Sequence, residues 1–368
     1  MTDSDKLQAV RARIDQLDEQ IQGLINERAG CAEEVARQKN IAGDNSEYYR
    51  PEREADVLRT VIARNKGPLP DDEMARLFRE IMSACLALQH PMTVAFLGPE
   101  GTYTQAAVYK QFGHSVRCQP LAAIDEIFRE VEAGTVHYGV VPIENSTEGA
   151  VSHTLDMFLN SPLQICSEVE MRIHHCLLGR TADAGAGGLA AVTEVRAHQQ
   201  ALAQCREWLD AKLPGVPRLP VSSNAEAARF AAEHDGVAAI AGEAAAEIYQ
   251  LNVLASNIED EPDNTTRFLV IGRKMPAPSG HDKTSLLLST PNRPGALQGL
   301  LAPLADKGIS MSRIESRPSR RGTWDYVFFV DIEGHAQEPA IAAVLQELEQ
   351  SAAMMKVLGS YPRAVIQA

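Results

Sequence analysis

The sequence is poor in long apolar runs, in paired cysteines and in positive charge. None of its apolar stretches approaches the roughly 18 residues that a membrane-spanning helix needs, so we predict no membrane segment. The six cysteines are scattered and form no CxxC pair, a pattern typical of reduced thiols and not of structural zinc. The net charge of −14 argues against a nucleic-acid-binding protein. Because the charged N-terminal stretch does not resemble a signal peptide, we expect a cytoplasmic protein.

Nucleotide-binding motifs are missing as well. The glycine-bounded loop Gly98-Pro99-Glu100-Gly101 follows an apolar run, but it matches neither GxGxxG nor GxxxxGK[ST]. A nicotinamide dehydrogenase and an ATP site are therefore disfavoured. His174, His175 and Cys176 adjoin one another inside an apolar run, which favours sheet residues over metal ligands. The sequence predicts neither a cofactor nor a metal site.

The chain is long enough for more than one hydrophobic core. A length of 368 residues suggests two or three domains, and a hydrophobic content of 45% is typical of globular proteins. Helical periodicity dominates residues 1–92, whereas strands and helices alternate over residues 93–273. Residues 275–280 (MPAPSG) have the composition of a linker. We therefore expect three domains, at 1–92, 93–273 and 281–368.

The N-terminal segment carries an apolar stripe with two cations on it. Apolar residues repeat at alternating spacings of three and four, at Leu7, Val10, Ile14, Leu17, Ile21 and Leu24. A helix of about 35 residues, roughly 50 Å long, needs a second copy of the chain to cover it, so we expect a homodimer. Arg28 and Lys39 project from this stripe, where a cation needs an acidic partner or an anionic ligand. Arg11 points about 100° away from that face and can join them only across a dimer.

Two further helices place polar groups on their apolar faces. The second helix is predicted to begin near Pro51, and Arg53 and Glu54 share the face of its apolar pairs. The third is predicted to begin at Asp71, and Gln89 closes its apolar stripe. Any one of these polar residues could simply be exposed to solvent. Four polar groups on three apolar faces are harder to explain in that way and favour a binding site.

Residues 1–92 resemble the all-helical chorismate mutase family, in which chorismate rearranges to prephenate. The reaction is pericyclic, so it needs no nucleophile and depends on a held conformer and on donors aimed at the ether oxygen. The resemblance implies that Glu54 accepts from the ring hydroxyl, and that Lys39 and Gln89 bond the ether oxygen. The residues implied to hold the two carboxylates are Arg28, Arg53 and, across a dimer, Arg11. The sequence departs at Cys85, where some relatives carry Ser, and at Arg50, where some carry an acid.

A dense polar group follows a short apolar run in the middle of the chain. The run from Tyr138 to Val141 is predicted to be a strand that Pro142 ends, and residues 144–148 (ENSTE) follow before Gly149 leads into a helix. A strand, a polar loop and a helix N-terminus in this order is where open α/β sheets bind ligands. The pattern fits a small, anionic, oxygen-rich ligand, and taken alone it fits an ordinary polar loop equally well.

Residues 93–273 resemble the prephenate dehydratase family through the motifs GPEGTYTQAA, VPIENSTEGAV, HTLD, HQQALAQC and NTTRFLVIG, in family order. The resemblance implies two α/β lobes, like those of periplasmic binding proteins, with the site in the cleft between them. In that family prephenate loses carbon dioxide and water to give phenylpyruvate; arogenate stays open as an alternative substrate. Thr266 is implied to lie closest to the leaving hydroxyl, as a proton or hydrogen-bond donor. The residues implied to seat the substrate are Thr102, Thr104, Asn145, Ser146, Thr147, Gln199, Gln204 and Arg267. Relatives often carry Ser where this chain has Ala197.

Residues 281–368 are predicted to form a βαββαβ unit, which is a ferredoxin-like α+β order. The expected strands are Thr284–Thr290, Ile309–Arg317, Trp324–Glu333 and Met355–Ser360, and the expected helices are Ala296–Lys307 and 338–353. The motifs GAL at 295–297 and ESRP at 315–318 resemble the amino-acid-sensing ACT domain. That resemblance implies feedback inhibition by L-phenylalanine bound between two such domains. The implied effector-binding residues are Gly295, Ala296, Leu297, Glu315, Ser316 and Arg317.

Taken together, the sequence predicts a bifunctional enzyme with an all-α chorismate mutase domain, a two-lobed α/β dehydratase domain and an ACT domain. One alternative is a dehydratase whose helical part serves only for dimerisation. The cations on the helical stripe argue against it, because a pure dimer seam more often carries Leu or Ile. The other alternative is a non-catalytic protein that binds small molecules between two lobes. The fused helical segment argues against that interpretation.

Overall fold

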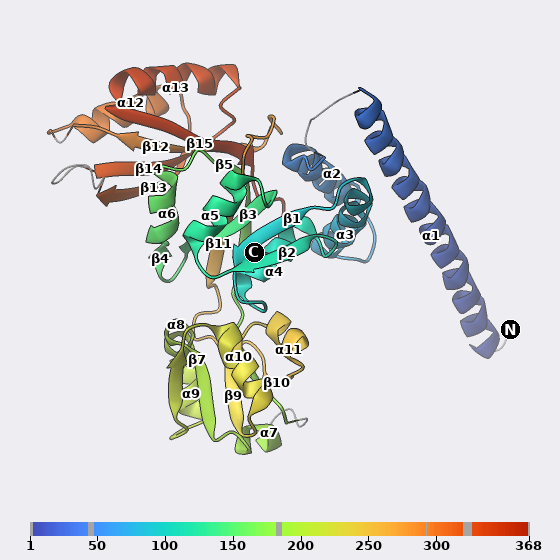
Figure 1. Cartoon of the computed structure of the whole chain (residues 1–368). Helices are drawn as coiled ribbons and strands as arrows, with labels where there is room; N and C mark the ends of the chain where they lie inside the picture. Colours follow the sequence, from blue (N-terminus) through green and yellow to red (C-terminus); the bar gives the residue numbers. More distant parts are fainter. Residues whose placement is uncertain (1–2, 43–47, 182–185, 292, 319–325, 367–368) are drawn as a thin grey trace.

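The computed structural model describes residues 3–42, 48–181, 186–291, 293–318 and 326–366. A two-lobed α/β part lies at the centre, with a helical part on one side and a small α+β part above its upper lobe (Figure 1). Trp324, where one strand was predicted to begin, lies outside the described residues. In the described ranges, no helix combines the length and the apolar character that crossing a membrane requires.

The helical part consists of α1 (Asp3–Ala42), α2 (Pro51–Arg64) and α3 (Asp71–Gln89). Pro51 occupies the first turn of α2, where the missing N–H of proline costs no helical hydrogen bond. Helix α3 packs on both α1 and α2. The long helix α1 contains no buried residue among those described, and its N-terminal end projects away from the rest of the chain (Figure 1). Its six apolar stripe residues, from Leu7 to Leu24, are each between 40 and 65% exposed.

The upper lobe is a sheet with the strand order β2-β1-β3-β11-β5. Its strands are β1 (Thr93–Leu97), β2 (Arg117–Leu121), β3 (Tyr138–Asn145), β5 (Gln164–Arg172) and β11 (Thr265–Gly272), and the short β4 (Gly149–Ala150) pairs with β3. Its helices are α4 (Tyr103–Phe112), α5 (Ile124–Ala133) and α6 (Ser152–Phe158). The prediction that Pro142 ends a strand is wrong, because β3 runs on to Asn145. An irregularity in the β11 register opposite Pro142 accommodates the proline.

The lower lobe is a second sheet with the strand order β10-β6-β9-β7-β8. Its strands are β6 (Cys176–Gly179), β7 (Glu194–His198), β8 (Arg218–Val221), β9 (Val237–Ala241) and β10 (Asn252–Ala255). Its helices are α7 (Ala186–Ala190), α8 (Gln199–Gln204), α9 (Arg206–Lys212), α10 (Asn224–Glu233) and α11 (Glu243–Tyr249). The chain passes between the lobes twice, from β5 to β6 and from β10 to β11 (Figure 1). Ala197, predicted to begin a helix, is instead buried in β7.

The C-terminal part has the antiparallel strand order β13-β14-β12-β15, which is ferredoxin-like. Its elements are β12 (Asp282–Ser289), α12 (Ala296–Asp306), β13 (Met311–Pro318), β14 (Tyr326–Glu333), α13 (Pro339–Ser351) and β15 (Met354–Pro362). Leu300 and Val344 of its two helices pack on one face of the sheet. The other face, through Phe329 and Tyr361, shares a core with the upper lobe. A Cβ on Gly359 would lie 2.3 Å from the carbonyl oxygen of Ile165, so the two sheets meet backbone to backbone.

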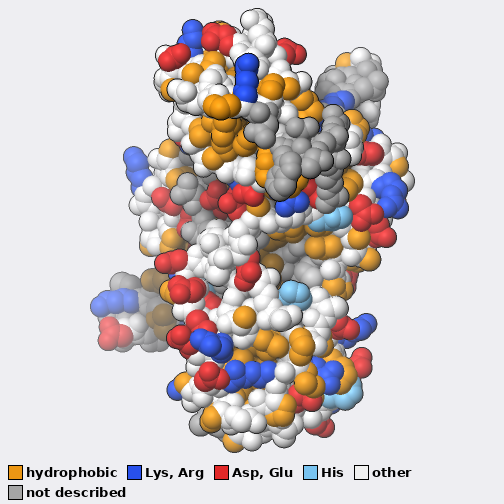
Figure 2. All heavy atoms as spheres, turned by 90° about the vertical axis from the view of Figure 1, so that its left-hand side faces the viewer, with side chains coloured by type: hydrophobic (Ala, Val, Ile, Leu, Met, Phe, Trp, Pro, Cys, Tyr) orange, Lys and Arg blue, Asp and Glu red, His pale blue; other side chains and the backbone are white. Residues whose placement is uncertain are grey.

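Acidic and basic side chains both occur over the upper and the lower part of the face that Figure 2 shows. They alternate with apolar and uncharged side chains, and the coloured residues of that face form no extended basic surface.

Two candidate active sites

The three helices enclose a pocket of about 480 Å³. Its lining includes the polar residues that the sequence singled out on three separate helices, namely Arg28, Lys39, Arg53, Glu54 and Gln89. Lys39 also lies 4.9 Å from the centre of the Tyr48 ring. Arg11 is exposed on α1 and does not line this pocket. Three cations, one carboxyl group and one amide thus converge from helices that are apolar on the same faces.

Among the described residues, Glu54 is the only one with a carboxyl side chain in the pocket lining. Burial raises its pKa to about 7, although the guanidinium of Arg79 opposes that rise. Arg79 Nε lies 3.4 Å from Glu54 Oε1, but neither atom has a hydrogen-bond partner among the described residues. Arg79 also donates from Nη1 to the carbonyl oxygen of Lys110 in the upper lobe. A buried Glu54 oxygen is therefore available to accept a hydrogen bond from a ligand.

A second pocket, of about 210 Å³, lies in the cleft between the two α/β lobes. Five residues that the sequence predicted to touch the substrate line it, namely Thr102, Thr104, Asn145, Gln204 and Thr266. Thr102 begins α4, and its hydroxyl accepts from the backbone N–H of Gln105. Asn145 and Thr266 face each other across the β3–β11 ladder. The upper lobe therefore supplies two polar edges of the cleft, and α8 of the lower lobe supplies Gln204.

Thr266 is oriented as a hydrogen-bond donor by its neighbour in the ladder. Asn145 donates from Nδ2 to Thr266 Oγ1 over 2.8 Å. The orientation of the Asn145 amide is fixed, because its Oδ1 accepts from the backbone N–H groups of Thr147 and Glu148, each at 3.0 Å. Since Thr266 Oγ1 accepts from Asn145, its own hydrogen remains to be donated into the cleft.

Three predicted seating residues lie outside the lining of the cleft. Ser146 exchanges hydrogen bonds with the backbone of Thr265, and the Thr147 hydroxyl donates to Asn264 Oδ1 over 3.4 Å. Both residues therefore brace the loop after β3. Gln199 is exposed, and Gln200 lines the cleft in its place. Gln199 is the first residue of α8, and the next residue along the helix is the one on the cleft side.

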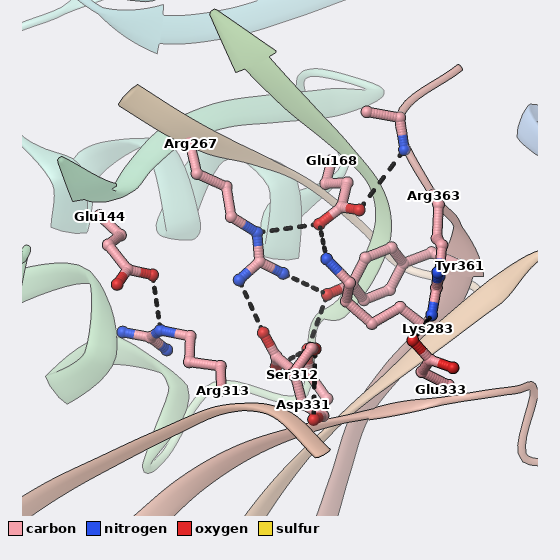
Figure 3. A network of polar contacts seen from close by, with 12 residues as sticks. Glu144, Glu168, Arg267, Lys283, Ser312, Arg313, Asp331, Glu333, Tyr361 and Arg363 are labelled. Carbon is pink, nitrogen blue, oxygen red and sulfur yellow. Dashed lines mark hydrogen bonds and ion pairs between the residues drawn. The ribbon is translucent and has the colours of Figure 1, made fainter. Parts of the chain in front are cut away.

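The prediction that Arg267 binds the substrate is wrong in this fold. Successive residues of a strand point to opposite faces, so Arg267 faces away from the cleft that Thr266 lines. All three guanidinium nitrogens are occupied: Nε by Glu168 at 2.8 Å, Nη1 by Asp331 at 2.6 Å and Nη2 by the Tyr361 hydroxyl at 2.9 Å. Figure 3 shows this network at the contact with the C-terminal part, where Arg313 also pairs with Glu144 at 2.7 Å. Burial disfavours the Arg267 charge, but Tyr361, Asp331 and Glu168 hold its pKa well above the usual value.

The predicted effector residues lie in two elements of the C-terminal part. Gly295, with a φ of 75°, precedes α12, and Ala296 and Leu297 form its first turn. Glu315, Ser316 and Arg317 lie in β13, at the edge of the sheet. Arg317 faces the upper lobe, where its guanidinium contacts Ser152 and lies 3.1 Å from Asp156. The contact with the upper lobe, and not an open surface, thus takes up two of the Arg317 nitrogens.

Several residues that the structure brings to the two sites could not be singled out from the sequence. Arg79 is buried next to Glu54, although the helical periodicity does not single it out. His175, Ser222, Ser223 and Asn264 line the cleft from three separate segments. A polar residue beside a strand end is common, so only the fold shows that these side chains meet.

The fold and the two pockets define a multidomain enzyme with separate sites for small polar substrates. Family models match three successive parts of the chain: chorismate mutase type II at residues 10–90, prephenate dehydratase at 94–276 and the ACT domain at 284–350. A bifunctional chorismate mutase/prephenate dehydratase from Stutzerimonas stutzeri is 56% identical over 370 residues, covering 100% of both chains. The chain belongs to the family of bifunctional chorismate mutase/prephenate dehydratases.

Solved structures resemble the chain without its helical part. A prephenate dehydratase from Arthrobacter aurescens in complex with L-Phe is 36% identical with a TM-score of 0.69, covering 75% of this chain and 92% of that one. A protein described as GqqA, a novel type of quorum quenching acylase, is 30% identical with a TM-score of 0.67, covering 74% and 98%. The two-lobed α/β fold and the C-terminal fold are thus shared with these proteins.

Proposed function

We propose that this chain converts chorismate to prephenate in the helical pocket and prephenate to phenylpyruvate in the interlobe cleft. The observation that carries the proposal is the presence of two separate polar sites in one chain of this family. We divide the chain into domains at 1–92, 93–273 and 281–368. All six cysteines are free, which supports a cytoplasmic location.

The helical pocket fits a reaction that depends on positioning and fixed charge. Arg28 and Arg53 offer guanidinium groups to the two carboxylates of chorismate. Lys39 and Gln89 donate to the ether oxygen, on which negative charge develops as its bond to carbon breaks. Glu54 accepts from the ring hydroxyl. No proton changes place in this rearrangement, so the pocket needs only to hold the reactive conformer and to stabilise the developing charge.

The cleft fits an elimination that needs a hydrogen-bond donor at the leaving hydroxyl. As the ring carboxylate of prephenate leaves as carbon dioxide, its electron pair enters the ring and expels the hydroxyl. Thr266 donates to that hydroxyl, which lowers the cost of the charge developing on it. Thr102, Thr104, Asn145 and Gln204 surround the substrate with hydroxyl and amide groups. Aromatisation of the ring supplies the driving force.

We propose a homodimer in which α1 contributes to two mutase sites. The exposed stripe from Leu7 to Leu24 would be covered by the second copy, and Arg11 would enter that copy's pocket. The test mixes Arg11→Ala chains with Arg28→Ala chains after unfolding and refolding them together. Complementation predicts mutase activity in the mixture that exceeds the sum of the two variants refolded alone. If the mixture stays inactive while both variants remain dimeric, the shared-site arrangement is contradicted.

We propose that L-phenylalanine inhibits the dehydratase through the C-terminal domain. The support is the ACT family match and the similarity to a dehydratase whose structure was solved with L-Phe. The proposed contacts are Gly295, Ala296 and Leu297 with Glu315 and Ser316, and Arg317 links this strand to α6. Gly295→Trp should shift the midpoint of inhibition upward, because the bulky ring fills the turn before α12. An unchanged midpoint would contradict the site.

The test of the two activities follows chorismate supplied as the sole substrate. We expect chorismate to disappear and phenylpyruvate to form, with prephenate as a passing intermediate. Prephenate that accumulates without phenylpyruvate would remove the dehydratase. Chorismate that is not consumed would remove the mutase and leave a dehydratase with a helical dimerisation domain. Supplying arogenate in a parallel assay decides whether the cleft prefers it to prephenate.

A further inference from the structure

A chain of hydrogen bonds joins the two lobes across the floor of the cleft. In the upper lobe, Asn145 Nδ2 lies 2.7 Å from Asn264 Oδ1 and also donates to Thr266. Asn264 Nδ2 lies 3.3 Å from Gln204 Oε1, which crosses to the lower lobe. Gln204 Oε1 lies 2.9 Å from His175 Nε2. The chain therefore runs from the catalytic hydroxyl through three amide side chains to an imidazole.

The donor and the acceptor of every hydrogen bond in this series follow from the Asn145 end. Backbone N–H groups can only donate, so the two that reach Asn145 from the loop after β3 make its Oδ1 the acceptor. The Asn145 amide then points Nδ2 at Asn264, which must offer Oδ1 in return. Asn264 is left to donate from Nδ2, so Gln204 must offer Oε1. The imidazole of His175 meets that oxygen, and it must therefore carry its hydrogen on Nε2.

The other side of the imidazole is compatible with this assignment. His175 Nδ1 lies 2.7 Å from the Tyr103 hydroxyl, whose single hydrogen is shared between Nδ1 and the backbone carbonyl oxygen of His174, 2.8 Å from the same hydroxyl. The ring is 2% exposed, and burial lowers its pKa, which keeps it neutral. A neutral imidazole with its hydrogen on Nε2 accepts from Tyr103 and donates to Gln204 at the same time.

These hydrogen bonds determine the orientation of the Gln204 side-chain amide. With its Oε1 bonded by both His175 and Asn264, its Nε2 is directed elsewhere. That nitrogen is buried in a residue that lines the cleft, and it has no hydrogen-bond partner among the described residues. A buried amide N–H without a partner is destabilising, and a substrate oxygen in the cleft would supply that partner.

We propose that His175 is a positioning residue for the dehydratase reaction: its Nε2–H holds the Gln204 amide so that Gln204 Nε2 donates to a prephenate oxygen. The inference rests on the proposed dehydratase function and adds a residue that does not itself need to touch the substrate. A histidine that only fills space would make the ring important and the hydrogen on Nε2 irrelevant. The two roles can therefore be told apart by replacing the imidazole with two amides, of which only one places a donor at the Nε2 position.

The decisive experiment compares His175→Gln with His175→Asn. A glutamine amide nitrogen reaches the position of Nε2 and can still donate to Gln204, whereas an asparagine amide reaches only the position of Nδ1. We expect His175→Gln to keep kcat/KM for prephenate within about threefold, and His175→Asn to lower it by about 10- to 100-fold with a raised KM, as misplaced contacts do. Equal losses in the two variants would overturn the proposal.

A matched control lies one residue away. The His174 ring points at Glu259, with Nδ1 and Oε1 2.7 Å apart, and does not line the cleft. We expect His174→Asn to leave dehydratase kinetics unchanged. Denaturant unfolding of the whole chain reports whether each variant is folded. A wild-type chain without dehydratase activity would remove the proposed function, whereas an active wild type with equal His175 variants removes only the positioning role.

A double-mutant cycle keeps the proposal testable if His175→Asn also weakens the fold. If His175 acts through Gln204, then His175→Asn should lower kcat/KM by less than about twofold when Gln204→Met is already present. Losses that multiply in the double variant would show that the two residues act independently, and the proposal would fail.

Discussion

The helical pocket and the interlobe cleft of this chain bind related anions with different side chains, charged in the pocket and uncharged in the cleft. The helical pocket is lined by Arg28, Lys39, Arg50 and Arg53, with Glu54 as its carboxyl group. The described residues that line the cleft include no Lys, Arg, Asp or Glu, and they present hydroxyl, amide and imidazole groups. The rearrangement needs fixed cations that hold one conformer, whereas the elimination needs a neutral donor whose hydrogen is free. The type of reaction therefore decides the type of site.

The same contrast recurs on the two faces of the β3–β11 ladder. Asn145 and Thr266, opposite each other in the ladder, face the cleft and are uncharged. The next two opposite residues, Glu144 and Arg267, face the C-terminal domain and are charged, and each forms an ion pair with a residue outside the ladder pair. Moving by one residue along a strand reverses the face. Charges are thus kept out of the cleft and are used instead to fix the neighbouring domain (Figure 3). The predictions below test this separation of charged from neutral sites.

The largest expected effect is on the cationic pocket. Arg28→Ala removes a carboxylate contact from the mutase site and should lower mutase kcat/KM by about 10³-fold, the upper range for one charge-stabilising group. Steady-state kinetics with chorismate measure this change. Dehydratase activity with prephenate should stay within twofold, about the scatter of such assays. A parallel loss of both activities would contradict separate sites.

The next effect concerns stability at the ionic face of the ladder. Arg267→Met leaves Asp331 buried without the cation at 2.6 Å, whereas Glu168 keeps Lys283 at 2.8 Å; the unpaired Asp331 should lower the free energy of unfolding by about 3–5 kcal/mol. Denaturant unfolding measures it. The control is Arg363→Met, because the Arg363–Glu333 pair is largely exposed and such pairs contribute at most about 1 kcal/mol. If Arg267→Met instead raised KM for prephenate at unchanged stability, the substrate role excluded by the structure would be restored.

A smaller effect is expected from the donor in the cleft. Thr266→Val keeps the shape of the side chain and removes its hydroxyl, so dehydratase kcat should fall by about 100-fold. Thr265→Val is the matched control, since Thr265 is the adjacent threonine and does not line the cleft. Single-turnover formation of phenylpyruvate measures the step. Similar losses in the two variants would show that strand packing, and not the hydroxyl, matters.

The smallest effect is a pH dependence that only the charged pocket should show. Because burial raises the pKa of Glu54 to about 7, the free enzyme gains a carboxylate as the pH rises through that value. A carboxylate is a stronger acceptor for the ring hydroxyl, so mutase kcat/KM should rise by up to about tenfold. Glu54→Gln should flatten this limb. A profile that falls through pH 7 would contradict an acceptor role.

The same raised pKa has a consequence for stability. The folded state favours protonated Glu54, so this stabilisation is complete below the ordinary value of 4.5 and is lost as the pH rises through about 7. Glu54→Gln, which stays neutral, should therefore gain stability relative to the unchanged chain over that interval. Unfolding midpoints at pH 5 and pH 8 measure the difference, and an opposite sign would contradict the assignment.

Most of the secondary structure that could be predicted from the sequence followed from the spacing of apolar residues. The alternating spacing of Leu7 to Leu24 predicted α1, and the short runs at 93–97 and 237–241 coincide with β1 and β9. The cations of the helical stripe meet in one pocket because helical spacing alone determines their face. Local patterns of this kind do not need the tertiary fold.

Other features depended on contacts between distant segments. His175 and Asn264 reach the cleft only because the chain crosses between the lobes twice. Pro142 was predicted to end a strand, but β3 continues through it because a register irregularity in the neighbouring β11 accommodates the proline. Arg267 was misassigned although a signal was present: a residue adjacent to Thr266 in a strand must face the other way.

The most direct test of two independent sites mixes two variants, each defective in one site. Arg28→Ala and Thr266→Val chains are assayed with chorismate, first separately and then together. Neither variant alone should form phenylpyruvate at an appreciable rate, and the mixture should form it after a lag while prephenate accumulates. A mixture as inactive as its parts, with both chains folded, would contradict the claim that one chain carries two separable sites.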